Sequence, residues 1–131
     1  MDLEDFSREI NVLVDEIETN VNTLMKQIAT GIDQTVVMAT PVDTGRARAN
    51  WTVTLNTRTK TSHERTDFEQ VLVESKAVID QYGSHTNAIY ITNNLAYIGK
   101  LNEGSSAQAP AGFVEIALHE AIDAIDGAHI V

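Results

Sequence analysis

The chain has 131 residues, the size of a single domain, and its 43% of hydrophobic residues are enough for one modest core. It carries 9 basic against 19 acidic residues, and this formal net charge of -10 argues against a phosphate-gripping nucleic-acid interface. It contains no cysteine, which excludes disulfides, thiolate nucleophiles and cysteine-based zinc sites.

The first 40 residues have the hydrophobic period of an amphipathic helix. Acidic residues crowd its first turns, and the helix is expected to end at Thr40, because a residue before proline is pushed out of the helical region. About 35 helical residues span roughly 50 Å, whereas a compact chain of this size is roughly 36 Å across. The helix must therefore bend, break (Gly31 is the weakest point) or protrude, and a protruding apolar stripe needs a second subunit to cover it. The stripe comprises Phe6, Ile10, Leu13, Ile17, Val21, Leu24, Ile28 and Ile32.

The segment from Pro41 to Gly45 has the composition of a turn, and after it the hydrophobic period changes to two. This alternation predicts a half-buried strand from about Arg46 to Asn56. Arg46 and Arg48 would lie on its polar face, where they either contact an acidic surface of a neighbouring subunit or partner, or pair locally with Asp43. The apolar face would carry Ala47, Ala49, Trp51, Val53 and Leu55.

The remaining pattern alternates helices and strands. The order of elements predicts an α+β fold in one domain over residues 1–131: a long N-terminal helix packed on a small antiparallel sheet, with additional short helices and a C-terminal helix. A third strand that the pattern does not reveal is suspected. After the first strand we expect a polar loop that is mobile in the isolated subunit (57–67), a helix (68–82) with a short strand (71–73) as the alternative, a turn (83–87), a second strand (88–92), a short helix (95–103) capped by Asn93-Asn94 and stopped by Gly104, a loop (105–111) and a last helix from Phe113 to about Ile125.

The sequence gives little support to an enzyme, a metal site or a bound cofactor. Asp43-Thr44-Gly45 matches the tripeptide of aspartic proteases, but Arg46 follows it and the approach contains a proline, so a turn is the better interpretation. Glu115, His119 and Asp123 share one face of the last helix, a spacing more typical of a solvent-facing charge ladder than of a metal site. Phosphate-loop, dinucleotide and Gly-x-Ser-x-Gly motifs are absent. No apolar run approaches the roughly 20 residues of a membrane span, and the acidic N-terminus is unlike a secretory signal, which predicts a soluble chain.

Two motifs resemble those of the tailed-bacteriophage tail-completion and neck proteins, the head–tail joining and minor tail group. The front motif is Thr40-Pro41-Val42-Asp43-Thr44-Gly45-Arg46 with Ala49-Asn50-Trp51. The back motif runs from Ile91-Thr92-Asn93-Asn94-Leu95-Ala96-Tyr97-Ile98 through Leu101 and Glu103-Gly104-Ser105 to Gln108-Ala109-Pro110-Ala111-Gly112 with Val114. The group commonly has a glutamate directly after the leucine, where this chain has Asn102, and a bulky residue after the glycine, where Ser105 stands.

The resemblance implies a structural virion protein whose subunits form a ring, a hexamer or dodecamer, at the neck or tail. The chain would be made in the host cytoplasm, its partners would be portal or connector, tail-terminator or tail-tube proteins, and DNA would only pass through the channel. The chain also has acidic ends and a basic middle, which could meet across a subunit boundary and fix its register. Interface residues are expected among Arg46, Arg48, Asn94, Tyr97, Glu103 and Gln108.

Two other functions remain open at this point. One is a small acidic binding or inhibitor module that mimics DNA, which would present its carboxylates in a phosphate-like array. The other is an aspartic-type hydrolase that uses Asp43.

Overall fold

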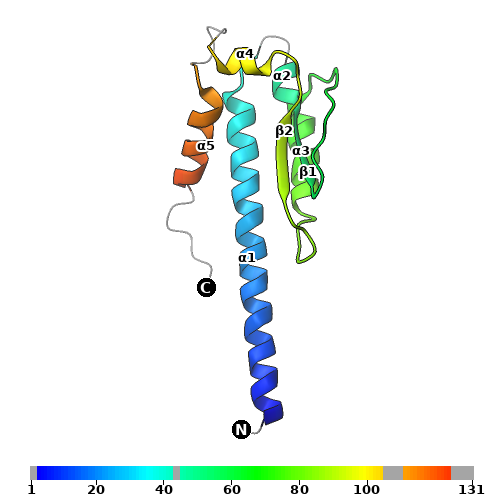
Figure 1. The fold of residues 1–131 in the computed structure, drawn as a ribbon, viewed down its shortest axis with the longest axis vertical. Helices are drawn as coiled ribbons and strands as arrows, with labels where there is room; N and C mark the ends of the chain where they lie inside the picture. The colour runs from blue at the N-terminus through cyan, green and yellow to red at the C-terminus, as the bar shows by residue number, and fades with distance from the viewer. Residues whose placement is uncertain (1–2, 43–44, 105–110, 125–131) are drawn as a thin grey trace.

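A computed structural model describes residues 3–42, 45–104 and 111–124. Helix α1 (Leu3–Ala39) forms the long axis, and Figure 1 shows its lower half extending beyond every other element. Helix α5 (Phe113–Ala124) packs along one side of its upper half. The sheet and helix α3 (Phe68–Ile79) lie on the other side, and the short helix α4 (Ile98–Asn102) crosses the end. This arrangement confirms the predicted α+β fold.

Helix α1 runs without a break for 37 residues and passes through Gly31, the weakest point of the predicted helix. At 1.5 Å per residue it is about 55 Å long. It ends at Ala39, one residue before the predicted end at Thr40. Of the three outcomes that its length allowed, the helix protrudes.

The sheet has two antiparallel strands, β1 (Trp51–Leu55) and β2 (Ile89–Asn93), in which Trp51 pairs with Asn93. Val53 of β1 packs with Ala29 of α1 and Ile79 of α3, so the sheet meets both helices through its apolar face. A second cluster of buried side chains joins α1, β1 and α5 and contains Val36, Val37, Trp51 and Ala117. The suspected third strand is not found among the residues that the structure describes.

Two predicted helices keep their type but change their bounds: α3 ends at Ile79 and not at Tyr82, and α4 is also shorter than predicted. The segment after the polar loop is helical, as α3, and not the alternative short strand. Helix α4 begins at Ile98 and not at Leu95, and its N-cap is Tyr97, which makes no side-chain cap bond. Gly104 has the left-handed φ of 100° expected of a residue that stops a helix.

The start of the predicted first strand was wrong. Residues Arg46–Ala49 form one helical turn, α2, and the strand begins only at Trp51. The alternating hydrophobic pattern predicted a strand here because Ala47 and Ala49 are both buried, although they lie in a helical turn. Alanine and arginine are also strong helix formers, so local propensity favours the turn. Arg46 and Arg48 therefore do not lie on the polar face of a strand.

Gly45, which precedes α2, is predicted to be intolerant of any side chain. Its φ is 84°, and a Cβ placed there would lie 2.7 Å from the carbonyl oxygen of Thr66. Replacing Gly45 with alanine should lower the free energy of unfolding by about 2 kcal/mol, measured by urea denaturation. Gly83 has no atom within 4 Å of a Cβ, so Gly83→Ala is the matched control and should change stability far less. Equal effects of both substitutions would contradict this assignment.

Candidate functional site

The most unusual surface of the molecule is the N-terminal half of α1, residues 3–20, which we call the arm. Every side chain that the structure describes in the arm is exposed. The exposed side chains include large aliphatic ones, with exposed fractions of 84% for Leu3, 54% for Leu13 and 41% for Ile17. From Val21 onward the helix is progressively covered by its own subunit, and Ala29 is its first buried residue. The arm therefore makes no part of the subunit core.

The arm combines exposed apolar surface with strong negative charge. It carries six acidic residues and a single basic one, Arg8, which pairs with Asp5 at 2.8 Å. Burying apolar surface contributes roughly 25 cal/mol per Å², so a row of exposed aliphatic side chains is a large unused driving force. Contiguous apolar patches of this kind usually mark interaction sites. The arm is the candidate functional surface of this chain.

The front motif closes the end of α1 inside the subunit. Trp51 Nε1 donates to the buried Thr40 Oγ1 at 2.8 Å, and this hydroxyl donates to the Val36 carbonyl at 2.7 Å. Arg48 donates from Nε to the Thr40 carbonyl at 2.7 Å and from a terminal nitrogen to the Met38 carbonyl at 2.9 Å. A cation at a helix C-terminus is favourable, because the last carbonyls carry partial negative charge. Thr40, Arg48 and Trp51 thus form a cap for α1.

Arg48 is a structural residue in this arrangement. Its guanidinium also lies 5.2 Å from the centre of the Phe68 ring, a cation–π contact that joins α2 to α3. Burial lowers the pKa of Arg48. The ordinary pKa of arginine is so far above neutral pH that the side chain stays charged. Any contact between Arg48 and a partner would be made by a side chain that already has these contacts within its own subunit.

Arg46 and Asn50 fix the polar loop that follows β1. Arg46 donates from Nε to the His63 carbonyl at 3.0 Å and forms an ion pair with the exposed Glu64 at 2.9 Å. The buried Asn50 side chain donates to the same carbonyl at 3.0 Å and accepts from the His63 amide at 2.9 Å. These bonds hold the middle of a loop that has no apolar anchor. They reduce the mobility that the sequence alone led us to expect.

The two asparagines of the back motif act in the same internal network. Asn93 donates to the Ala47 carbonyl at 2.9 Å and accepts from the Leu95 amide at 3.1 Å. Asn94 donates to the Thr59 carbonyl at 2.8 Å, which ties the loop to the end of β2. The front and back motifs therefore meet in space, at the end of the sheet nearest α2 and α4. Their asparagines stabilise the fold, and the described bonds of Asn94 lie within the subunit.

The remaining predicted interface residues are more scattered. Tyr97 is partly exposed at the start of α4, and Glu103 is exposed at its end. Gln108 lies outside the described residues, as does Asp43, so the turn chemistry and the hydrolase alternative built on Asp43 have no described geometry. Of the five described residues in this prediction, Arg46 and Arg48 lie on α2, Asn94 directly follows β2, and Tyr97 and Glu103 flank α4.

Asn102 has a structural role that the sequence did not reveal. Its Oδ1 accepts from the Val114 amide at 2.9 Å, and its Nδ2 lies 3.1 Å from both carboxylate oxygens of Glu115. Its carbonyl also accepts from the Gly112 amide. The side chain therefore satisfies the first turn of α5 from a residue of α4, eleven positions before the start of that helix. A glutamate, the usual residue of the resembled family here, offers no amide donor to Glu115.

Removing this cap should weaken α5. Replacing Asn102 with alanine is expected to lower the free energy of unfolding by about 1 kcal/mol, because an amide of the first turn loses its acceptor. Chemical denaturation of both proteins measures the difference. Exposed Asn11, on the arm, supplies the matched control, because Asn11→Ala removes the same group where no capping bond is recorded. An Asn102→Ala protein as stable as the Asn11→Ala protein would refute the capping role.

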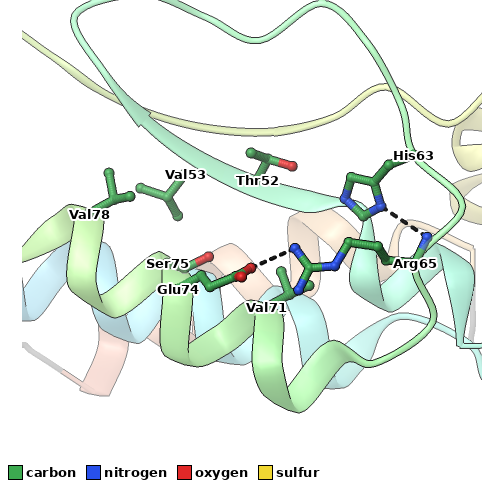
Figure 2. A pocket seen from close by; sticks show the side chains of 8 residues that line it. All are labelled: Thr52, Val53, His63, Arg65, Val71, Glu74, Ser75 and Val78. Atoms are coloured by element: carbon green, nitrogen blue, oxygen red, sulfur yellow. Dashed lines mark hydrogen bonds and ion pairs between the residues drawn. The ribbon is translucent and has the colours of Figure 1, made fainter.

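A cavity of about 180 Å³ lies between β1, α3 and the polar loop, and Figure 2 shows its lining side chains. The charged side chains that line the cavity already form an ion pair with one another. Arg65 pairs with Glu74 at 2.6 Å, and His63 Nδ1 accepts from the Arg65 amide at 3.3 Å. Burial, and then the charges of Arg65 and Arg46, lower the pKa of His63. The cavity is smaller than the roughly 300–1,000 Å³ of ordinary ligand sites, and we assign it no ligand.

A carboxyl is buried behind this cavity. Asp33 of α1 is only 2% exposed, and burial raises its pKa to about 7, although a hydrogen bond with Ser75 of α3 acts in the opposite direction. Its second oxygen, Oδ1, has no hydrogen-bond partner. Asp33 bonds to the serine and not to His63, so these three residues do not have the connectivity of a catalytic triad. The pair joins α1 to α3 in the core.

Within the described ranges, no three His, Asp or Glu side chains come together in a way that could hold a metal ion. Glu115, part of the charge ladder on α5, instead contacts Asn102. Among the same residues, no helix has the length and apolarity required to cross a membrane. Comparison with protein-family models, curated proteins and solved structures finds no match to this chain.

Proposed function

We propose that the chain is a structural subunit that assembles with copies of itself into a ring at the neck or tail of a tailed-phage virion. The arm is the single observation that carries the self-assembly part of this proposal. A helix that leaves half of its length and a row of aliphatic side chains outside its own fold is built to be covered by another chain. The front and back motifs support the more specific part, the location at the head–tail joint.

The internal role of the two motifs is compatible with this proposal. The motifs cap α1 and lock the polar loop, so they set the direction in which the arm leaves the body. In a ring, all arms must leave their bodies in the same direction along the axis, because cyclic symmetry repeats one arrangement around it. A rigid joint between arm and body meets that requirement.

Self-assembly is tested on the purified full chain by mass photometry over a range of concentrations, followed by negative-stain electron microscopy. The expected result is a closed ring of six or twelve subunits. A particle that stays monomeric at micromolar concentration would contradict the proposal. The location is tested separately with gold-labelled antibodies against the chain, which should bind at the head–tail joint of virions and not along the tail or on the capsid.

The acidic DNA mimic is the second candidate function, and the charge of the arm favours it in part. A mimic needs carboxylates in a phosphate-like array, whereas the arm interrupts its carboxylates with exposed aliphatic side chains. Competition with duplex DNA for a basic DNA-binding protein separates the two functions. A mimic displaces the DNA, and a ring subunit leaves it bound.

A further inference from the structure

We infer that the partner of the arm is the same arm of a second copy, and that pairs of arms form a short, parallel two-stranded coiled coil. This inference rests on the self-assembly proposed above and names the surface that carries it.

Four of the six large aliphatic residues exposed on the arm follow the a and d positions of a coiled-coil heptad, whereas Val12 lies at a c position. Leu3, Ile10 and Ile17 are seven residues apart and occupy a positions, and Leu13 occupies the d position between the last two. All four are exposed in the subunit. Isoleucine at a with leucine at d favours two parallel strands over higher oligomers. Val14, at the neighbouring e position, widens the same exposed stripe.

The acidic residues of the arm lie where this pairing tolerates them. Four of the six are at b, c and f positions, which point away from the seam, namely Glu4, Asp5, Asp15 and Glu18. The other two, Glu9 and Glu16, are at g positions. In a parallel pair a g residue faces the e residue of the next heptad, which here is Val14 or Val21. In an antiparallel pair the g residues face each other, and the two glutamates would repel.

An acidic arm could instead lie on a basic surface of a neighbouring body, the arrangement that the charge distribution of the sequence first suggested. Two cations on and beside α3 already form ion pairs within the subunit. Arg65 pairs with Glu74 at 2.6 Å, and Lys76 pairs with Asp80 at 3.2 Å. The exposed outer face of α5 adds acidic residues, among them Glu120 and Asp123. These two cations are therefore already paired, whereas a second arm offers a matching exposed apolar stripe.

The length of the arm limits how strong this contact is. Its 18 residues span about 27 Å, or two and a half heptads, and free helices of this length pair weakly. Arms held side by side by their bodies have a high effective concentration, which makes a short seam sufficient. The parallel direction fits this setting, because the arms of a cyclic ring all point the same way along its axis.

The absence of cysteine in the chain permits a direct test by oxidative cross-linking of the full-length protein. Leu13→Cys places a thiol in the seam, and Asn11→Cys, at a b position, places one away from it. Both sites are exposed in the subunit, and thermal melting checks that both variants fold. Under mild oxidation Leu13→Cys should give at least about tenfold more disulfide-linked dimer than Asn11→Cys on a non-reducing gel.

Salt provides a second readout. Cross-linking through Leu13→Cys should become faster as NaCl is raised, because the paired arms are both acidic and salt screens their repulsion. Contact between the arm and a basic surface would weaken with salt. If rings form but Leu13→Cys cross-links no better than Asn11→Cys, or slows with salt, this inference fails and the proposed function stands. If the protein stays monomeric, both fail.

Discussion

A protein that lacks residues 1–20 is expected to fold normally and to remain monomeric at concentrations where the full chain assembles. The deletion removes surface that is already exposed, and the helix that remains still supplies Ala29, Asp33, Val36 and Val37 to the interior. Its thermal midpoint should stay within a few degrees of that of the full chain, because exposed residues contribute little to stability. Mass photometry of the two proteins at equal concentration measures the loss of assembly.

A point substitution separates loss of the contact from loss of the helix. Leu13→Asp introduces a charge into the arm, and Val73→Asp introduces the same charge on the outer face of α3, where the valine is also exposed. The first should abolish or strongly weaken assembly, and the second should leave it unchanged. If the truncated chain still forms rings, the arm is not the assembly surface and another face of the body must be.

Replacing Asp33 with asparagine is expected to change the pH dependence of stability. Burial raises the pKa of this carboxyl to about 7 from its ordinary value of 3.8. A raised pKa means that the folded state holds the proton more tightly than the unfolded state does. Stability from this group is therefore fully present below pH 4, falls as pH rises, and levels off above pH 7. A shift of about three pKa units corresponds to roughly 4 kcal/mol.

The measurement is the difference in unfolding free energy between Asp33→Asn and the unchanged protein at a series of pH values. The difference should grow in favour of the variant by roughly 4 kcal/mol between pH 4 and pH 8. Subtraction removes the contributions of the other carboxyls, such as Glu74, whose pKa the hydrogen bond from Arg65 lowers. Ser75→Ala is the companion variant: it removes the hydrogen bond but keeps the carboxyl, so the pH-dependent loss should persist. A difference that does not vary with pH would show that Asp33 is ionised in the folded protein.

The long helix was the most predictable part of the structure from sequence, because its apolar period continues over about seven turns and a proline marks its end. The comparison of its length with the diameter of a compact chain predicted that it would bend, break or protrude. The pattern could not decide between bending, breaking and protruding at Gly31. A glycine in a helix costs only about 1 kcal/mol, and neighbouring turns tolerate it.

The misassigned strand shows where local pattern fails. Residues 46–49 are too few for periodicity to distinguish a helical turn from an alternating strand, and both place Ala47 and Ala49 inside. Gly45, whose φ is left-handed, starts the helical turn, and a turn glycine was predicted there. The Thr66 carbonyl oxygen, which leaves no room for a side chain at Gly45, is twenty-one positions away in the sequence. The same limit hid Asn102 and Asp33. A cap supplied by a preceding helix, or a carboxyl buried against another element, leaves no periodic signal.

The interface prediction for Arg48 and Asn94 stays a prediction, because their bonds within the subunit do not exclude contacts with a partner. Arg48 and Asn94 stand in motifs that resemble those of a self-assembling family, and charged or amide side chains in such motifs are readily interpreted as contacts with a partner. The structure gives both of them internal acceptors, at 2.7 Å for Arg48 and 2.8 Å for Asn94. The candidate surface lies in the arm, whose exposed aliphatic residues the helical period had already indicated.

The separation of the arm from the core has a kinetic consequence. Because the interior closes around residues from Ala29 onward, a newly made chain can reach its folded shape alone, by a first-order process whose rate is independent of concentration. Joining is then a second-order event that begins only once enough finished subunits have accumulated. Under the proposed self-assembly, the abundance of the protein itself therefore sets the time at which assembly begins.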